Sequence, residues 1–184
     1  MKQHIFPALR LTVVCILLFM GIYPLLVWSI AKAAPASGEG ETITLNGRVV
    51  GYKLEGQRFT ADRYFTGRPS ATGYNASLSG GSNKGPSDSA YLTEVRARID
   101  SFLGHNPDIR KENIPSDLVT ASGSGLDPDI SLQAALVQAA RISAVRAIPE
   151  RSVINLIKEQ TDKSINGIQK INVLRINIAL DQLK

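Results

Sequence analysis

The longest apolar run of the chain lies near its N-terminus, where residues 11–30 read LTVVCILLFMGIYPLLVWSI without a charged side chain. A helix of this length covers about 30 Å, which is the thickness of the hydrocarbon core of a bilayer. Gly21 and Pro24 lie inside the run, and membrane helices tolerate both residue types. A cleaved signal peptide has a shorter apolar stretch, and a buried core helix shows a polar face. We therefore expect a transmembrane anchor over residues 11–31.

Shorter patterns follow the anchor. Residues 32–42 are mostly small and include proline and glycine, which predicts a linker. The pair Asn46-Gly47 separates two runs rich in β-branched residues, and this predicts a hairpin because both central residues of a type I′ turn need a positive φ. We expect residues 43–184 to form one domain, since about 150 residues suffice for one core.

Helical spacing of apolar residues marks the second half of the chain and predicts three helices, over about residues 89–103, over 131–147 and from Pro149 onward. The apolar residues of 171–181 nearly alternate, which favours a last strand, while a helix capped by Asn172 also fits. A hairpin, about three helices and a possible C-terminal strand predict an α+β domain.

Basic residues flank the anchor unequally. Lys2, Arg10 and the terminal amine precede it, whereas Lys32 alone follows it closely. Positive charge tends to remain on the cytoplasmic side, so we expect residues 1–10 in the cytoplasm and the domain outside the membrane. Without these three residues the chain has 18 basic against 16 acidic side chains, so its net charge of +5 does not indicate a nucleic-acid binder.

Two segments are rich in glycine and serine, over residues 66–90 and 120–131. The first is too long for an idle connection in a compact domain, so it is either disordered or an ordered loop with a function. Leu78, Ser79, Gly80, Gly81 and Ser82 spell LSGGS, which resembles the phosphate-contacting signature loop of ABC-type ATPases. Glycines let backbone amides approach an anion, but the sequence has no Walker A loop that could support hydrolysis. A purely structural loop is the other interpretation.

The sequence shows no pattern typical of an enzyme or of a metal site. Cys15 lies inside the anchor, and His4 and His105 have no partner at metal-ligand spacing. Serine is abundant, but no GxSxG elbow is present. We expect no catalytic residue, no metal and no covalently bound cofactor.

Five stretches in order along the chain carry a resemblance to a known family: FTGRPSA (65–71), YNASLSGGSNKGPSD (74–88), IPSDLVTASGSGLDP (114–128), the set Gln138, Arg141 and Arg146, and INVLRINIALD (171–181). Together with the single anchor they resemble the C subunit of the bacterial Kdp-type potassium-transporting ATPase. The resemblance spans essentially the whole chain. One departure is Asp129, which stands where the family usually has histidine, so any role of that histidine does not carry over.

The resemblance implies a single-pass accessory subunit of the bacterial inner membrane that is not itself an enzyme. Its implied partners are a channel-like potassium-translocating subunit, a P-type ATP-hydrolysing subunit and a small membrane subunit. The family's C subunit is associated with assembly of this complex. It is also described as a catalytic chaperone that binds ATP and raises the nucleotide affinity of the hydrolysing subunit, with the LSGGS stretch invoked in nucleotide binding.

A domain outside the membrane cannot reach cytoplasmic ATP, so a bound nucleotide cofactor conflicts with the expected topology. We expect instead that polar loop residues form the partner interface or raise the local concentration of K⁺ near the channel subunit through the electrostatic field of their charges. The candidates are Arg68, Asn75, Asn83, Asp117, Asp127 and Asp129. A cytoplasmic ATP-binding module and an independent anchored hydrolase are the alternatives from other classes.

Overall fold

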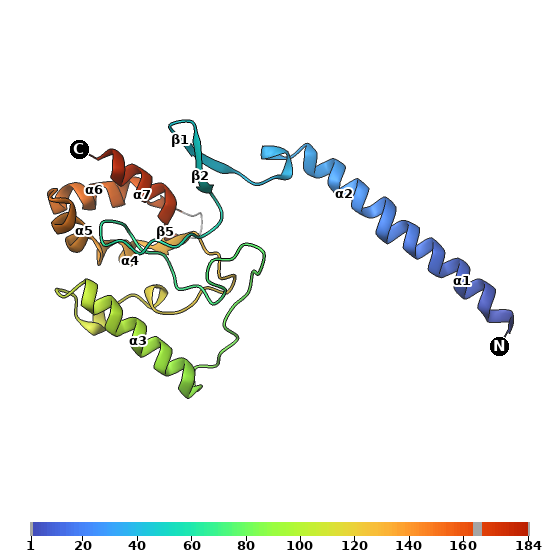
Figure 1. Cartoon of the computed structure of the whole chain (residues 1–184), viewed down its shortest axis with the longest axis horizontal. Helices are drawn as coiled ribbons and strands as arrows, with labels where there is room; N and C mark the ends of the chain where they lie inside the picture. Colours follow the sequence, from blue (N-terminus) through green and yellow to red (C-terminus); the bar gives the residue numbers. More distant parts are fainter. Residues whose placement is uncertain (1, 164–166, 184) are drawn as a thin grey trace. The chain divides into compact units, whose positions relative to one another are not determined.

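The computed structural model describes residues 2–163 and 167–183 and divides into two compact units, Met1–Glu41 and Thr42–Lys184 (Figure 1). The first unit is dominated by one continuous helix made of α1 (Lys2–Ile16), η1 (Leu17–Ile22) and α2 (Tyr23–Lys32). Its segment Gln3–Lys32 is long and apolar enough to cross a membrane. Among the described residues of this helix, no large apolar side chain is buried, which is consistent with a helix that crosses a membrane.

A proline explains the irregular middle of this helix. Pro24 lacks the amide hydrogen that would close an ordinary helical turn. The preceding segment Leu17–Ile22 adopts a π-helix, and the amide of Tyr23 donates to the carbonyl of Leu18, five residues earlier. The widened turn accommodates the proline and keeps the neighbouring backbone groups hydrogen-bonded, as a helix that crosses a membrane would require.

The chain folds back on itself where α2 ends. A short 3-10 segment, η2 (Pro35–Gly38), follows α2. The Cα of Gly38 comes so near the last turn that a Cβ there would lie 3.0 Å from the Cβ of Ala31. The ammonium group of Lys32 pairs with the carboxylate of Glu39 at 3.1 Å. The predicted linker therefore begins as a compact turn at the helix end.

The second unit starts with the predicted hairpin. Strands β1 (Thr42–Leu45) and β2 (Arg48–Tyr52) pair antiparallel, with an irregularity between Ile43 and Thr44. Asn46 and Gly47 both have positive φ, 50° and 76°. This confirms the turn that the Asn-Gly signal predicted.

The rest of the second unit combines five helices with a small sheet among the described residues. The helices are α3 (Ser89–His105), α4 (Leu132–Leu136), α5 (Ala139–Arg146), α6 (Glu150–Gln160) and α7 (Val173–Gln182), with short 3-10 turns η3 (Lys111–Asn113) and η4 (Ser116–Leu118). The strands are β3 (Asp129–Ser131), β4 (Asp162–Lys163) and β5 (Gln169–Asn172). They pair antiparallel in the order β3-β5-β4, which makes the domain α+β as predicted.

Two expectations about helices need correction. The predicted helix over 131–147 is divided into α4 and α5, because Gln138 turns its side chain into the core and its amide bonds only three residues back, to Ala135. The preference for a strand over 171–181 is wrong beyond Asn172, whose side chain accepts from the amide of Arg175 and begins α7. The apolar residues of 171–181 nearly alternate because the end of β5 is followed directly by the apolar stripe of α7.

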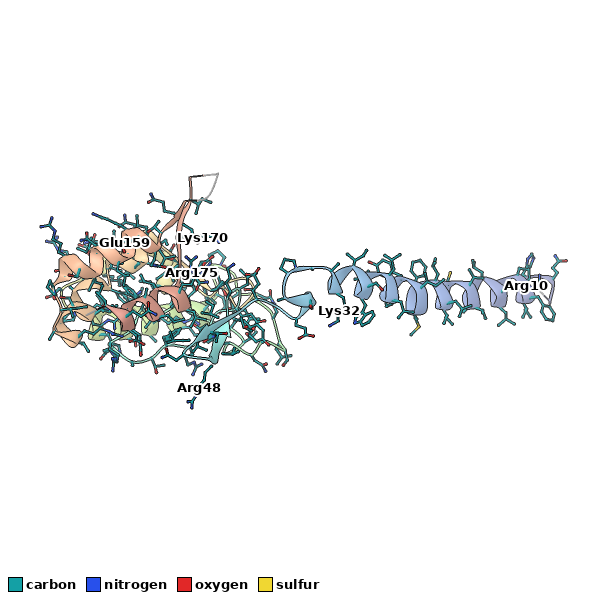
Figure 2. The ribbon with its side chains drawn as sticks, turned by 90° about the horizontal axis from the view of Figure 1, so that it is seen from above. Arg10, Lys32, Arg48, Glu159, Lys170 and Arg175 are labelled. Carbon is teal, nitrogen blue, oxygen red and sulfur yellow. The ribbon has the colours of Figure 1, made fainter. Side chains whose placement is uncertain are left out.

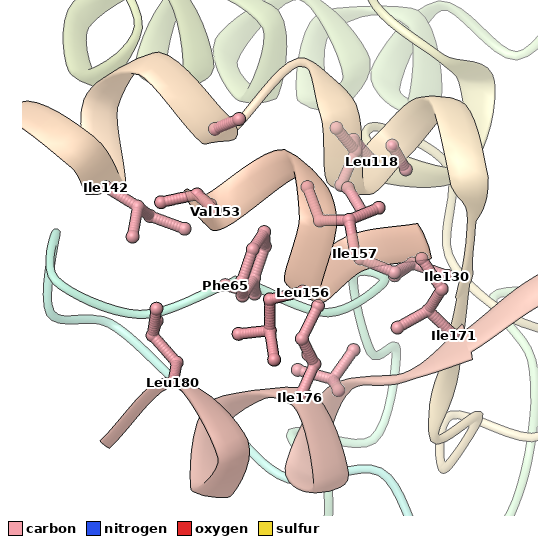
Figure 3. Close-up of a cluster of buried hydrophobic side chains, with 14 residues drawn as sticks. Phe65, Leu118, Ile130, Ile142, Val153, Leu156, Ile157, Ile171, Ile176 and Leu180 are labelled. Atoms are coloured by element: carbon pink, nitrogen blue, oxygen red, sulfur yellow. The ribbon is translucent and has the colours of Figure 1, made fainter. Parts of the chain in front are cut away.

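The hydrophobic core lies between α4–α7 and the β3-β5 pair, with Phe65 inserted from an extended segment (Figure 3). Its fully buried side chains include Ile142 of α5, Ile157 of α6 and Ile176 of α7. Helix α3 contributes no fully buried residue and only Phe102 packs against this core. The core therefore fixes one side of the domain and leaves the glycine-rich segments to be held in another way.

Candidate functional site

The two glycine- and serine-rich segments are ordered because they bond to each other. We refer to residues 66–88 and 119–128 together as the loop pair. The amide of Ser122 donates to the carbonyl of Pro69 at 3.1 Å, and the amide of Gly80 donates to the carbonyl of Ser124 at 2.8 Å. The hydroxyl of Ser70 donates to the carbonyl of Gly125 at 2.7 Å. These bonds join segments about 50 residues apart and give the irregular backbone fixed partners.

Small residues are required where the two segments cross. Gly125 has φ of +69°, and a Cβ there would lie 2.5 Å from the hydroxyl of Thr72 and 2.9 Å from the carbonyl of Gly80. At Gly81 a Cβ would lie 3.1 Å from the carbonyl of Gly123. Glycine at these positions permits the close backbone contact that a larger residue would prevent.

A partly buried ion pair joins the two segments of the loop pair. The guanidinium of Arg68 donates to the carboxylate of Asp127 at 2.9 Å. The hydroxyl of Tyr74 donates to the carbonyl of Arg68, and burial raises the pKa of this phenol while the charge of Arg58 opposes the shift. Within the described residues, Nε of Arg68 is buried without a hydrogen-bond partner. The ion pair therefore carries the orientation of Arg68 largely by itself.

The LSGGS segment takes part in this interlock. The amide of Gly80 and the hydroxyl of Ser79 both donate to the carbonyl of Ser124, at 2.8 Å and 3.1 Å. Leu78 points outward and is 63% exposed. A phosphate cradle needs backbone amides that are free to face an anion, and the Gly80 amide is already bonded to a carbonyl. In the structure this segment connects the two loops through hydrogen bonds and exposes the apolar side chain of Leu78.

The two asparagines among the predicted site residues shape the backbone of the first loop. The side-chain oxygen of Asn75 accepts from the amide of Ser77 at 3.0 Å and from its hydroxyl at 2.7 Å, which forms an Asx turn. Asn83 has φ of 52°, a left-handed conformation that asparagine adopts more easily than most residues. Both residues lie on the exposed side of the loop pair.

The three predicted aspartates do not form one open acidic cluster. Asp127 pairs with Arg68, and Asp129 pairs with the ammonium of Lys170 at 2.6 Å. Asp117 accepts from the amide of Ser131 at 2.8 Å. Because two of the carboxylates have a cation beside them, the field that the three acids project into solvent is largely compensated.

Comparison with known families gives this surface its context. A model of the KdpC family, described as the c chain of the K⁺-transporting ATPase, matches residues 5–182. The chain belongs to the KdpC family. Proteins named potassium-transporting ATPase KdpC subunit align over 99% of this chain and their own full length, with 51% identity in Flavobacterium johnsoniae, 49% in Flavobacterium psychrophilum and 46% in Bacteroides thetaiotaomicron. The family resemblance of the sequence motifs is thereby confirmed.

Several motif residues have no role that could be predicted from the sequence. The structure gives them one, which is to hold the extended segment of residues 62–66 against the helices. The side chain of Asn177 bonds both the amide and the carbonyl of Phe65, at 2.8 Å and 3.0 Å. Gln138 accepts from the amide of Thr66 at 2.8 Å, and Arg146 donates to the carbonyl of Arg63 at 2.7 Å. In the sequence, the only indication of this role is that these polar residues lie within the apolar stripes of helices.

A groove of about 470 Å³ lies between this extended segment and α3. Arg141 lines it and donates to the side chain of Asn106 at 3.0 Å and to the carbonyl of Asp62. The ring of His105, the last residue of α3, lies 2.8 Å from the carboxylate of Asp62. Burial lowers the pKa of Arg141, and Asp62 partly offsets this. These contacts tie the end of α3 to the rest of the domain.

Proposed function

We propose that this chain is a non-catalytic accessory subunit of an ATP-driven potassium uptake complex. Its anchor helix holds it in the bacterial inner membrane, and its domain stabilises assembly of the complex from the extracytoplasmic side. The proposed partners are the channel-like potassium-translocating subunit, the P-type ATP-hydrolysing subunit and the small membrane subunit. The full-length match to the KdpC family carries this proposal.

The loop pair is the proposed docking surface. Cross-loop hydrogen bonds hold it in one conformation before any partner binds, so docking loses little conformational entropy. Leu78 stands exposed at its tip, and an apolar side chain on a rigid support is well suited to fill a pocket in a partner. Arg68, Asn75 and Asn83 then act by fixing the shape of the surface rather than by making every contact themselves.

Attraction of K⁺ by Asp117, Asp127 and Asp129 has less support than docking. The charges of Asp127 and Asp129 are compensated by Arg68 and Lys170. We therefore propose that these acids act mainly by ordering the loop pair, and that any contribution to ion access is secondary.

The docking role is tested by a matched pair of variants, Leu78→Asp and Ile168→Asp. Their side chains are equally exposed, 63% and 64%, so a charge at either site has little effect on folding. We expect Leu78→Asp to weaken association with the other subunits by about 2 kcal/mol, roughly 30-fold, as for a central interface residue. Ile168→Asp should leave association unchanged. Co-purification of the solubilised complex measures both, and an equal yield from the two variants contradicts docking through Leu78.

The alternative is a catalytic chaperone that binds ATP through residues 78–82 on the cytoplasmic side. The exposure of Leu78 and Ser79 favours it, while the bonded amide of Gly80 counts against it. The two functions require opposite topologies. A C-terminal fusion to alkaline phosphatase in bacterial cells should be active under the assembly proposal. An inactive phosphatase together with a fluorescent C-terminal fusion protein would instead move the domain to the cytoplasm and favour the chaperone.

A further inference from the structure

The hairpin β1-β2 has regular backbone but no core of its own. Within the part of the chain that the structure describes, its two strands form a separate sheet and pair with each other alone. Neither strand has a buried residue. A two-stranded hairpin is marginally stable in water unless something covers one of its faces. Apolar residues on a face that the domain leaves open would therefore gain from a further covering surface.

The strand register shows which face is uncovered. Ile43 pairs with Gly51, and a Cβ on Gly51 would overlap the side-chain amide of Gln57, so the domain covers this face. Thr44 pairs with Val49 and Thr42 pairs with Tyr52, which places Val49 and Tyr52 together on the opposite face. Val49 is 62% exposed, and Leu54, just beyond the strand, is 71% exposed.

Chain connectivity keeps this hairpin close to the membrane. The ion pair between Lys32 and Glu39 fixes Glu39 at the end of the membrane helix. Only Gly40 and Glu41 separate Glu39 from the first residue of β1. Three residues span at most about 10 Å, and a five-residue strand adds about 17 Å. Every residue of the hairpin is therefore within reach of the lipid headgroups, whichever side of the membrane the domain occupies.

We propose that the face formed by Val49 and Tyr52, together with the exposed Leu54 just beyond the strand, lies in the lipid–water interface of the bilayer that the anchor crosses. Aliphatic side chains, an aromatic ring and a nearby cation are the combination that partitions into such an interface. Arg48, at the turn, extends away from the hairpin ribbon (Figure 2) and supplies the cation that favours anionic headgroups.

A lipid surface fits the observations better than a protein groove. The apolar residues stand on a projecting two-stranded ribbon rather than around a hollow. The short tether also presents the bilayer to the hairpin at high effective concentration even when no partner is bound. The interfacial hairpin depends on the membrane anchor and does not depend on the assembly role proposed above.

The test uses the full chain in vesicles of phosphatidylethanolamine and phosphatidylglycerol, alone and in the assembled complex. Cys15→Ser removes the native thiol, and a nitroxide is attached at Val49→Cys or Leu54→Cys. Val145→Cys is the control, since Val145 is an exposed apolar residue of α5 outside the hairpin. Power-saturation spectroscopy compares collisions with oxygen, which is enriched in lipid, and with a water-soluble nickel chelate.

Interfacial insertion predicts that oxygen collides more often than nickel at residues 49 and 54, and that nickel dominates at residue 145 in the chain alone. The hairpin labels should give the same result in the complex. Protection from both reagents only after assembly would mean that a protein subunit covers the hairpin and would overturn the proposal. Dominance of nickel at all three sites would show a solvated hairpin and would also overturn it. Neither result bears on whether Leu78 mediates assembly.

Discussion

The loop pair and the hairpin reverse the usual relation between regular structure and order. The hairpin has two paired strands and a turn of the expected type, yet its strands have no buried residue. The loop pair lacks helix or strand over most of its length, yet Ser70, Gly80 and Ser122 bond across it to residues far away in sequence. Order in this domain comes from tertiary hydrogen bonds and close packing, and local backbone preference alone supplies only a marginal element.

Two glycines with similar backbone angles allow the largest test of this contrast. Gly125 has φ of +69° and is crowded by the carbonyl of Gly80, whereas Gly47 has φ of +76° and open space around its Cα. We expect Gly47→Ala to cost about 1 kcal/mol for the left-handed conformation alone. Gly125→Ala adds a clash with backbone and should cost about 3 kcal/mol or more.

Thermal unfolding of the full chain in detergent measures both changes, and about 1 kcal/mol corresponds to roughly 2 to 4 °C for a chain of this size. Gly125→Ala should also lower co-purification of the partner subunits, whereas Gly47→Ala should not. Equal losses of stability would mean that the loop pair is no more constrained than the hairpin turn.

The ion pair between Arg68 and Asp127 provides a second, smaller comparison. Arg68→Ala leaves a partly buried carboxylate without its cation and should destabilise the domain by about 2 kcal/mol. The matched change Arg175→Ala removes a more exposed pair with Asp162 at 3.4 Å and should cost about 0.5 kcal/mol or less. Denaturant unfolding gives both values.

A double-mutant cycle with Asp127→Ala separates pairing from lost packing. If Arg68 acts through the ion pair, the double variant should be little worse than either single variant. Additive losses would show that Arg68 stabilises the loop pair through its stem instead.

The sequence predicted the local features of both regions and missed the contacts between distant ones. Asn46-Gly47 identified the hairpin because a two-residue turn depends only on neighbouring residues. Composition indicated that residues 66–90 were either ordered and functional or disordered, but it could not show that Gly80 meets Ser124, since nothing in the order of small residues encodes a partner. The same limit hid Asn177, whose amide bonds Phe65 from within an apolar helix.

The acidic candidates show the limit most directly. Asp127 and Asp129 lie close together in the sequence, which led to the prediction that their negative charges are uncompensated and attract K⁺. In the fold each meets a cation supplied from elsewhere, Arg68 in one case and Lys170 in the other. Local sequence therefore identified the residues but not their charge balance, which depends on tertiary pairing.

The smallest effect concerns alkaline pH, where two groups of the domain lose protons. The hydrogen bond and charge of Asp129 raise the pKa of Lys170, and burial raises the pKa of Tyr74. Each group holds its proton more tightly in the folded state, so its contribution is complete below the unfolded pKa of about 10 and is lost as pH rises through the folded value. Because Lys170 is largely exposed, solvent screening limits its share to about 0.5 kcal/mol.

Unfolding of the native chain, of Lys170→Met and of Tyr74→Phe between pH 9 and about pH 11.5 separates the two groups. Lys170→Met should remove a small part of the alkaline loss, and Tyr74→Phe should remove the larger part, because the phenol is buried within the loop pair and bonded to the carbonyl of Arg68. An unchanged pH slope in Tyr74→Phe would mean that the loop pair opens before the phenol ionises. In that case the loop pair would open by local unfolding at high pH, and it would be more stable than the hairpin only near neutral pH.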